Sequence, residues 1–386
     1  MPQPDTANNV YSALTAGDPA PWFRQRNTSN PNYTFDTAAG RYIVMCFYLT
    51  AGDSIGQDAL KAVATHRQLF DDNKISFFGI SVDPNDESEG RVRESMPGIR
   101  LFWDFDHKVC RLYGALPTVQ GADDTHLRAR RFWLILDPNL RVVRSFPMLA
   151  DGANVSEVFA FLAELAPVDN YTGAALTAPV LYLPRVFEPE LCRHLIGLYE
   201  AEGGTESGFM REIGGKTVAV MDGDHKRRRD VHVTDEQIIA VIQRRVMRRI
   251  VPEIAKVHQF EATRMERYIV GCYTAEDGGH FNAHRDNTTK GTAHRRFAIT
   301  INLNADFEGG ELCFPEYGPR TYKPPIGGAV VFSCSLLHRV SRVTHGRRYA
   351  FLPFLYDEAA ARLREQNNPY LDATLPVYSA SAEGPA

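Results

Sequence analysis

The sequence lacks any surplus of positive charge. Over 386 residues, 43 lysines and arginines are outnumbered by 47 aspartates and glutamates, which gives a net charge of −4. Binding along phosphates needs a basic surplus, so no nucleic-acid partner is expected. No apolar run is long enough to cross a bilayer, and the first residues have neither the basic nor the apolar segment of a secretion signal. We therefore expect neither a membrane partner nor secretion.

Cysteine is scarce and scattered. The six cysteines form no C-x-x-C pair, and they stand at positions 46, 110, 192, 272, 313 and 334. Such a distribution suits reduced thiols better than a disulfide framework. We therefore expect a cytoplasmic protein.

The first half of the chain alternates between strand and helix patterns. Apolar runs at 41–50 and 74–83 predict strands buried on both faces, and 56–73 between them has helical periodicity. A hairpin at 130–148 and a helix at 154–166 follow. This order predicts an α/β sheet with a parallel portion, in a domain that covers residues 1–167. Residues 168–178 lack periodicity and are the expected linker.

The second half follows a different pattern. Helices are expected at 188–203 and 234–257, and many short strands separated by Gly and Pro turns follow them. Such a run predicts an antiparallel jelly roll with helical support over residues 179–358. Residues 359–386 are polar, and we expect a loose or draped tail.

Three potential metal ligands stand in the second half. His284 and Asp286 are two residues apart, so a strand would direct both side chains to one face. His338 follows another apolar strand. Two imidazoles and one carboxylate form the facial triad of non-heme Fe(II) oxygenases, which leaves metal positions open for a 2-oxo acid and O₂.

An arginine completes the pattern. A 2-oxo diacid carries a remote carboxylate, and burial of that charge requires a fixed cation that can pair with both oxygens. Arg348 lies after the turn at His345–Gly346, on the next strand. Its neighbour Arg347 should face the opposite side.

At this point the segment 178–357 resembles the prolyl 4-hydroxylase-like branch of the Fe(II)/2-oxoglutarate dioxygenases. The matching motifs are "APVLYLPRVFEPELCRHLI", "YTAEDGGHFNAHRD", "RRFAITINLNADFEGGELCFP", "YKPPIGGAVVFS" and "LHRVSRVTHGRRYAF". The resemblance implies a double-stranded β-helix with Fe(II) held by His284, Asp286 and His338. It also implies that Arg348 and Tyr273 bind the cosubstrate 2-oxoglutarate. Phe281 stands where the family often has tyrosine, which removes one hydroxyl donor.

The implied reaction is the conversion of 2-oxoglutarate and O₂ to succinate and CO₂, coupled to hydroxylation of a C–H bond. Ascorbate would serve as an accessory reductant. Related halogenases carry a small residue in place of the carboxylate, so Asp286 favours hydroxylation. The resemblance leaves the substrate open, because function depends on the site and not on the fold: an amino-acid or peptide side chain and a free small molecule both remain.

Residues 18–166 resemble the peroxiredoxin branch of the thioredoxin-like fold, through "GDPAPWF", "GRYIVMCFYLTAGDSIGQDAL", "ISFFGISVDPND" and "RRFWLILDPNLRVVRSF". That family needs Pro, Thr and a peroxide-reactive Cys at positions that here hold Leu49, Asp53 and Gly56. Without a thiolate no nucleophile is present. Arg131 matches the arginine that would support the missing thiolate. We expect a degenerate domain that serves dimerisation or substrate access, so a homodimer is one further expectation.

The same residues have several alternative interpretations. The triad pattern could arise by chance, or the same ligands could hold a hydrolytic zinc, although zinc would not explain Arg348. The "HRD" at 284–286 is also found in protein kinases, but the other kinase motifs are missing. A thiol-based redox protein would use Cys46 or Cys110 and a sensing C-terminal module, and a non-catalytic 2-oxoglutarate- or metal-binding module is the third possibility.

A basic run lies at 224–233. A solvated loop is the favoured interpretation. The alternative is a lid over the metal site that contacts an acidic substrate through Lys226, Arg227, Arg228 and Arg229.

Overall fold

The computed structural model describes residues 11–118 and 129–381. The chain divides into two compact units: Met1–Thr177 with Pro315–Gly318, and Ala178–Phe314 with Pro319–Ala386. Among the described residues, no helix has the length and apolar character that a membrane crossing requires. Residues 1–10, for which no secretion signal is expected, lie outside the described ranges.

The first unit is built on a five-stranded mixed sheet in the order β5-β4-β3-β6-β7. Strands β3, β4 and β5 are parallel, while β6 and β7 continue the sheet as an antiparallel hairpin. The elements are β1 (Arg24–Gln25), β2 (Tyr33–Thr34), β3 (Tyr42–Leu49), α1 (Ser54–Thr65), β4 (Ile75–Ser81), α2 (Pro84–Ser88), β5 (Ile99–Trp103), α3 (Lys108–Leu112), β6 (Phe132–Leu136), β7 (Val142–Pro147) and α4 (Val155–Ala163).

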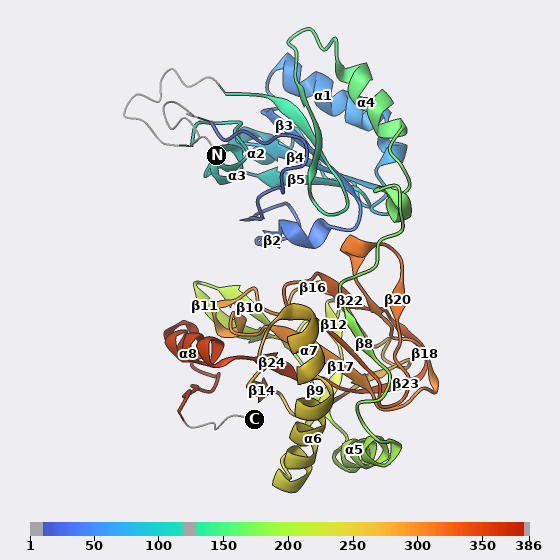
Figure 1. The fold of residues 1–386 in the computed structure, drawn as a ribbon. Helices are drawn as coiled ribbons and strands as arrows, with labels where there is room; N and C mark the ends of the chain where they lie inside the picture. Colours follow the sequence, from blue (N-terminus) through green and yellow to red (C-terminus); the bar gives the residue numbers. More distant parts are fainter. Residues whose placement is uncertain (1–10, 119–128, 382–386) are drawn as a thin grey trace. The chain divides into compact units, whose positions relative to one another are not determined.

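Both faces of this sheet are covered, which explains the continuous apolar runs in its central strands. Every residue of β3 and β4 is buried. Helices α1 and α4 lie side by side on one face (Figure 1), where Val63 and Val158 join one core cluster. On the other face Phe35 packs against Phe78 of β4 and Phe102 of β5. Burial on two faces removes the need for alternation, as expected for parallel strands. The thioredoxin-like, peroxiredoxin-type fold is confirmed.

The described residues of the second unit form two large antiparallel sheets and a separate two-stranded hairpin, β10-β11. One follows the order β14-β24-β17-β23-β15-β13-β9, with β18, β21 and β8 attached, and the other follows β12-β16-β22-β19-β20. The predicted antiparallel jelly roll is confirmed. The strands are β8 (Leu181–Leu183), β9 (Thr205–Glu206), β10 (Phe209–Ile213), β11 (Lys216–Val220), β12 (Lys226–Arg227), β13 (Arg229–His232), β14 (Arg264–Glu266), β15 (Ile269–Thr274), β16 (His280–His284), β17 (Phe297–Asn302), β18 (Phe307–Gly309), β19 (Leu312–Cys313), β20 (Thr321–Tyr322), β21 (Ala329–Ser333), β22 (His338–Val340), β23 (Val343–Phe351) and β24 (Phe354–Tyr356).

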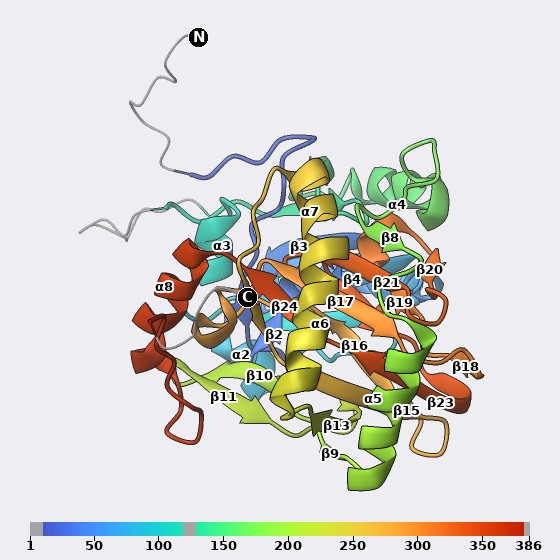
Figure 2. The same ribbon diagram turned by 60° about the horizontal axis from the view of Figure 1, so that its bottom comes forward.

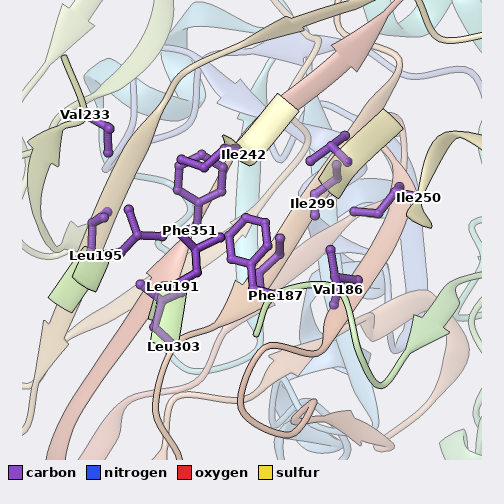
Figure 3. Packing of buried hydrophobic residues seen from close by; sticks show 14 of the residues in the cluster. Val186, Phe187, Leu191, Leu195, Val233, Ile242, Ile250, Ile299, Leu303 and Phe351 are labelled. Carbon is purple, nitrogen blue, oxygen red and sulfur yellow. The ribbon is translucent and has the colours of Figure 1, made fainter. Parts of the chain in front are cut away.

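Helices support the larger sheet from outside the barrel. Figure 3 shows Phe351 of β23 surrounded by Leu195 of α5 (Pro189–Glu202) and Ile242 of α6 (Glu236–Arg249). Figure 2 shows α6 and α7 (Val251–His258) crossing in front of the strands. These helices bury the outer face of the sheet, so the inner face is left to form the site.

The predicted single helix at 234–257 is wrong in one respect. It is two helices, α6 and α7, and the break falls at Ile250. Pro252 stands in the first turn of α7, where its missing N–H is tolerated, whereas inside a continuous helix its ring would clash with the preceding turn.

The segment expected to be a tail begins with helix α8 (Glu358–Gln366). Ala360 and Ala361 are fully buried, and Arg364 forms a 3.0 Å ion pair with Glu266. This part of the chain therefore packs on the second unit.

Candidate metal and cosubstrate site

The smaller sheet of the second unit brings the three predicted ligands together. His284 at the end of β16 stands directly opposite His338 at the start of β22. Strand β16 ends at His284, and Asp286 lies in the turn that follows it, not on the same strand as expected; its N–H donates to the Cys334 carbonyl at 2.9 Å. Asp286 lies between the two rings, with its oxygens 3.6 Å from His284 Nε2 and 3.4 Å from His338 Nε2. One ligand atom from each residue lies within 4.8 Å of the others.

Both histidines are oriented for metal binding. His284 Nδ1 donates to the Asn282 carbonyl at 2.7 Å, and His338 Nδ1 donates to the Leu336 carbonyl at 3.0 Å. A carbonyl oxygen can only accept, so each Nδ1 carries the proton and each Nε2 keeps its lone pair. The Phe281 ring stacks on His284 at 3.5 Å and holds that imidazole in place.

The protonation states also suit a cation. Burial alone would raise the pKa of Asp286, but the neighbouring His338 and His284 hold it below its usual range. Burial, reinforced by His284, lowers the pKa of His338 to about 4. Around neutral pH the aspartate is therefore ionised and His338 is neutral, which are the forms that bind a metal.

Arg348 provides a separate test of the expected cosubstrate. It is 2% exposed, with Nε donating to Asn302 Oδ1 at 3.1 Å and Nη2 donating to Thr300 Oγ1 at 2.7 Å. Its Nη1 is buried without a hydrogen-bond partner. Within the described ranges, no carboxylate lies at ion-pair distance from it. An orphaned guanidinium edge fits the distal carboxylate of 2-oxoglutarate, because a buried charge is stable only when it is paired.

The residues that orient Arg348 were missed from the sequence. Thr300 and Asn302 both lie on β17, where every residue is buried. The signal was present, because two polar residues at i and i+2 in the apolar strand "FAITIN" share one face and cannot be explained by solvent exposure.

Tyr273 lies beside Arg348. The two are cross-strand neighbours on β15 and β23, and the Arg348 guanidinium stands 5.4 Å from the centre of the Tyr273 ring. The phenol oxygen accepts from Arg228 Nη1 at 3.3 Å. Tyr273 therefore keeps its own O–H for donation to a further acceptor.

The basic run at 224–233 is not the solvated loop that the sequence favours. Lys226–Arg227 form β12 and Arg229–His232 form β13. Lys226 and Arg228 are buried, at 3% and 7% exposure, whereas Arg227 and Arg229 are exposed. The loop prediction failed because Asp230 neutralises part of the charge: it accepts two hydrogen bonds from Arg228, at 2.6 and 2.7 Å.

In the first unit, the position of the peroxide-reactive cysteine is closed by the backbone. A Cβ added at Gly56 would lie 1.8 Å from the carbonyl oxygen of Thr50. Asp53 caps α1 by accepting from the Gly56 N–H at 3.0 Å, and its carboxylate also pairs with Arg131 at 2.7 and 2.5 Å. The arginine that would support a thiolate is thus occupied by a protein carboxylate.

The cysteines offer no substitute nucleophile. All six are free and buried. Burial raises the pKa of Cys46, and burial together with Asp104 raises that of Cys110, in both cases well above the ordinary value. Reactive thiols need the opposite shift, so neither has the environment that a thiol-based redox function requires.

The fold and the site define a two-domain protein: a redoxin-like unit without a nucleophile, and a jelly roll with a His-Asp-His triad. Residues 16–145 match the AhpC/TSA family, and residues 266–356 match the 2OG-Fe(II) oxygenase superfamily. The chain therefore combines an N-terminal AhpC/TSA peroxiredoxin-like domain with a C-terminal 2OG-Fe(II) oxygenase domain that resembles PKHD-type hydroxylases and prolyl 4-hydroxylases.

Individual relatives match only parts of the chain. A PKHD-type hydroxylase of Acaryochloris marina is 40% identical over 76 residues, which is 19% of this chain and 35% of that protein. The chain spans between 35% and 50% of the length of the first such relatives.

Solved structures are similar to each unit in turn. A Pseudomonas putida prolyl-4-hydroxylase aligns with 49% of this chain and 96% of its own, at 17% identity and a TM-score of 0.37. The peroxidoxin BcpB from Mycobacterium tuberculosis aligns with 40% of this chain and 99% of its own, at 17% identity and a TM-score of 0.32.

Proposed function

We propose that this protein is an Fe(II)- and 2-oxoglutarate-dependent hydroxylase. The observation that carries the proposal is Arg348: a fully buried guanidinium with an orphaned Nη1, in the same barrel as the triad. A site built only for a structural metal would not need this cation. A cosubstrate that chelates the metal at one end and carries a carboxylate at the other would occupy both features.

In this proposal His284, Asp286 and His338 hold Fe(II) through Nε2, a carboxylate oxygen and Nε2. Bound iron supplies the activation of O₂ that couples decarboxylation of 2-oxoglutarate to insertion of one oxygen atom into a substrate C–H bond. The products are succinate, CO₂ and the hydroxylated substrate, so both atoms of O₂ are accounted for. Arg348 binds the distal carboxylate, and Tyr273 has a hydroxyl free to donate beside it.

Three further assignments stay predictions. The substrate is an amino-acid or peptide side chain or a small molecule, with neither nucleic acid nor membrane as a partner. A homodimer through the redoxin-like unit is expected from the sequence alone. Cytoplasmic location is supported by six cysteines without a disulfide.

The test uses the full chain loaded with Fe(II). Without O₂, 2-oxoglutarate should bind, as measured by calorimetry and by the charge-transfer absorption of the Fe(II) chelate. With O₂ and ascorbate, succinate should form slowly even without a substrate, and faster when the right substrate is added. Iron binding with neither cosubstrate binding nor succinate formation would contradict the proposal.

The matched control is His345→Ala. This histidine is exposed on β23, the strand that also carries Arg348, and it is not one of the three ligands. Its replacement should leave cosubstrate binding and succinate formation unchanged.

A further inference from the structure

Three neighbouring basic side chains, Lys226, Arg228 and Arg267, have fewer carboxylates than they could pair with, and Lys226 and Arg228 are buried. Within the described residues, Asp230 is the one carboxylate at ion-pair distance from Arg228 and Arg267. Arg228 pairs with it at 2.6 Å and Arg267 at 3.6 Å. Lys226 forms no ion pair with it. Arg228 and Arg267 therefore share one carboxylate, and the Lys226 amine beside them has none.

Lys226 is the member with unused capacity. Its ammonium donates to Ser207 Oγ at 2.7 Å and to the Gly208 carbonyl at 2.6 Å, both neutral acceptors. An ammonium has three N–H groups, so one remains. Burial, reinforced by Arg228, lowers the pKa of Lys226 to about 5, so without a counter-ion the amine is neutral at pH 7. A carboxylate bound beside it would favour the protonated form with its third N–H.

Lys226 also lies next to the triad. It is the cross-strand partner of Phe281, so both side chains project from the same face of the β12–β16 pair. Its ammonium is 5.1 Å from the centre of the Phe281 ring, and that ring stacks on His284 at 3.5 Å. The His284 and Asp286 side chains are 14% and 13% exposed, so this side of the site is open to solvent.

The cosubstrate does not account for this amine. In the proposed function, 2-oxoglutarate has two carboxylates: one would bind with the keto group at the metal, and Arg348 would bind the other. Arg348 is linked to the Lys226 cluster only through Tyr273, which contacts both Arg348 and Arg228. A third anionic group is needed to match Lys226.

We propose that Lys226 binds a carboxylate of the substrate, so that the substrate is an acid-bearing small molecule and not a neutral peptide side chain. The inference rests on the proposed function and narrows its substrate class. The incoming carboxylate would accept the third N–H of Lys226 and supply the counter-charge that the cluster lacks.

The test compares matched pairs of probes on the full chain loaded with Fe(II) and 2-oxoglutarate in the absence of O₂. The probes are free L-amino acids and dicarboxylic acids, each beside the corresponding carboxamide. Calorimetry should find acids that bind about tenfold or more tightly than their amides, the gap expected for one charge-assisted hydrogen bond to a buried cation. A panel in which no acid binds more tightly than its amide overturns the inference, and this comparison depends on no variant.

Lys226→Gln keeps hydrogen-bond donors and removes the charge. It should abolish the preference for acids while 2-oxoglutarate binding stays within about twofold of wild type, as for an independent site. Lys256→Gln on α7 is the control, because Lys256 is exposed and pairs only locally with Glu253; the preference should persist.

The outcomes separate the two proposals. A Lys226→Gln protein with wild-type melting temperature but weakened 2-oxoglutarate binding assigns Lys226 to the cosubstrate and overturns the inference. Wild-type protein that binds 2-oxoglutarate and forms succinate, yet shows no acid preference, overturns only the inference. Failure to bind 2-oxoglutarate at all removes the proposed function first.

Discussion

Each unit of the protein has an arginine at a position that its family resemblance singles out, and the two arginines differ in what they contact. Arg131 is paired on both sides with Asp53. Arg348 is held by two neutral side chains, and one edge has no partner. A guanidinium that the protein itself neutralises is closed to ligands, whereas one that is buried and left unpaired requires a ligand. The same residue type is therefore neutralised by the protein in one unit and left available in the other, where we propose that it binds 2-oxoglutarate.

The backbone supports the same distinction. In the redoxin-like unit, the Thr50 carbonyl fills the space that a side chain at position 56 would need. In the jelly roll, strand pairing sets His284 opposite His338 and leaves their Nε2 atoms free. The first unit has lost the room for its chemistry as well as the reactive residue.

The largest effect is expected from the triad. His338→Ala should abolish iron-dependent succinate formation, because two ligands cannot hold the metal. The loss of activity should exceed the roughly 10–100-fold loss that follows removal of a residue that only hydrogen-bonds to a metal ligand. Metal analysis after dialysis, together with succinate assays, checks this; a variant that keeps iron and turnover would remove His338 from the site.

Next in size is Arg348→Met. We expect 2-oxoglutarate to bind about a hundredfold more weakly or worse, the order of a lost buried ion pair. Iron binding should persist. Arg347→Met is the control, since Arg347 is the adjacent residue and its side chain is 48% exposed. Equal effects of the two substitutions in calorimetric titrations would contradict the assignment.

An attempt to restore the first unit should fail. Gly56→Cys should destabilise that unit by about 2 kcal/mol or more, because the new Cβ forces the backbone near Thr50 to move. It should not produce peroxidase activity. Urea unfolding and a peroxide-consumption assay measure the two results, and a stable variant that reduces peroxide would show that the pocket is still open.

The smallest effect concerns the pair that occupies Arg131. The Asp53 side chain is 43% exposed, so Asp53→Asn should cost only about 0.5–1 kcal/mol; Asn still caps the helix, which isolates the charge. Arg131 lowers the folded-state pKa of Asp53 below 3.8. The ion pair therefore contributes its full share to the free energy of unfolding above the unfolded-state pKa of about 4. This share is lost as the pH falls through the folded-state pKa of Asp53.

Denaturation should be measured from pH 7 to pH 3. The difference in the free energy of unfolding between wild type and Asp53→Asn should disappear below about pH 4. A gap that stays constant over this range would mean that the ion pair contributes nothing.

The sequence predicted those features that depend on local pattern. The His-x-Asp spacing predicted that His284 and Asp286 lie close together, although a turn and not strand alternation positions Asp286. The continuous apolar runs predicted strands buried on both faces. Neither pattern shows which residues will pair with a buried charged side chain. The sequence predicts Lys226 and Arg228 as surface residues. Their hydrogen bonds to Ser207 and Asp230, respectively, become apparent only in the assembled sheet.

The ends of helices were also difficult to predict from the sequence. Residues 234–257 have helical periodicity throughout, so one helix was predicted. Pro252 was the one sequence signal of the break at Ile250. Helix α8 was missed because its burial rests on two alanines, Ala360 and Ala361, which carry little hydrophobic signal.

The two backbone carbonyls that fix His284 and His338 have a consequence for metal choice. Because the rings are oriented before any ion arrives, the protein does not rearrange to discriminate among divalent metals. Nitrogen-rich sites bind Ni²⁺, Cu²⁺ and Zn²⁺ more tightly than Fe²⁺. Correct loading then depends on which metals the cell keeps available, and protein purified without added iron should carry the wrong one.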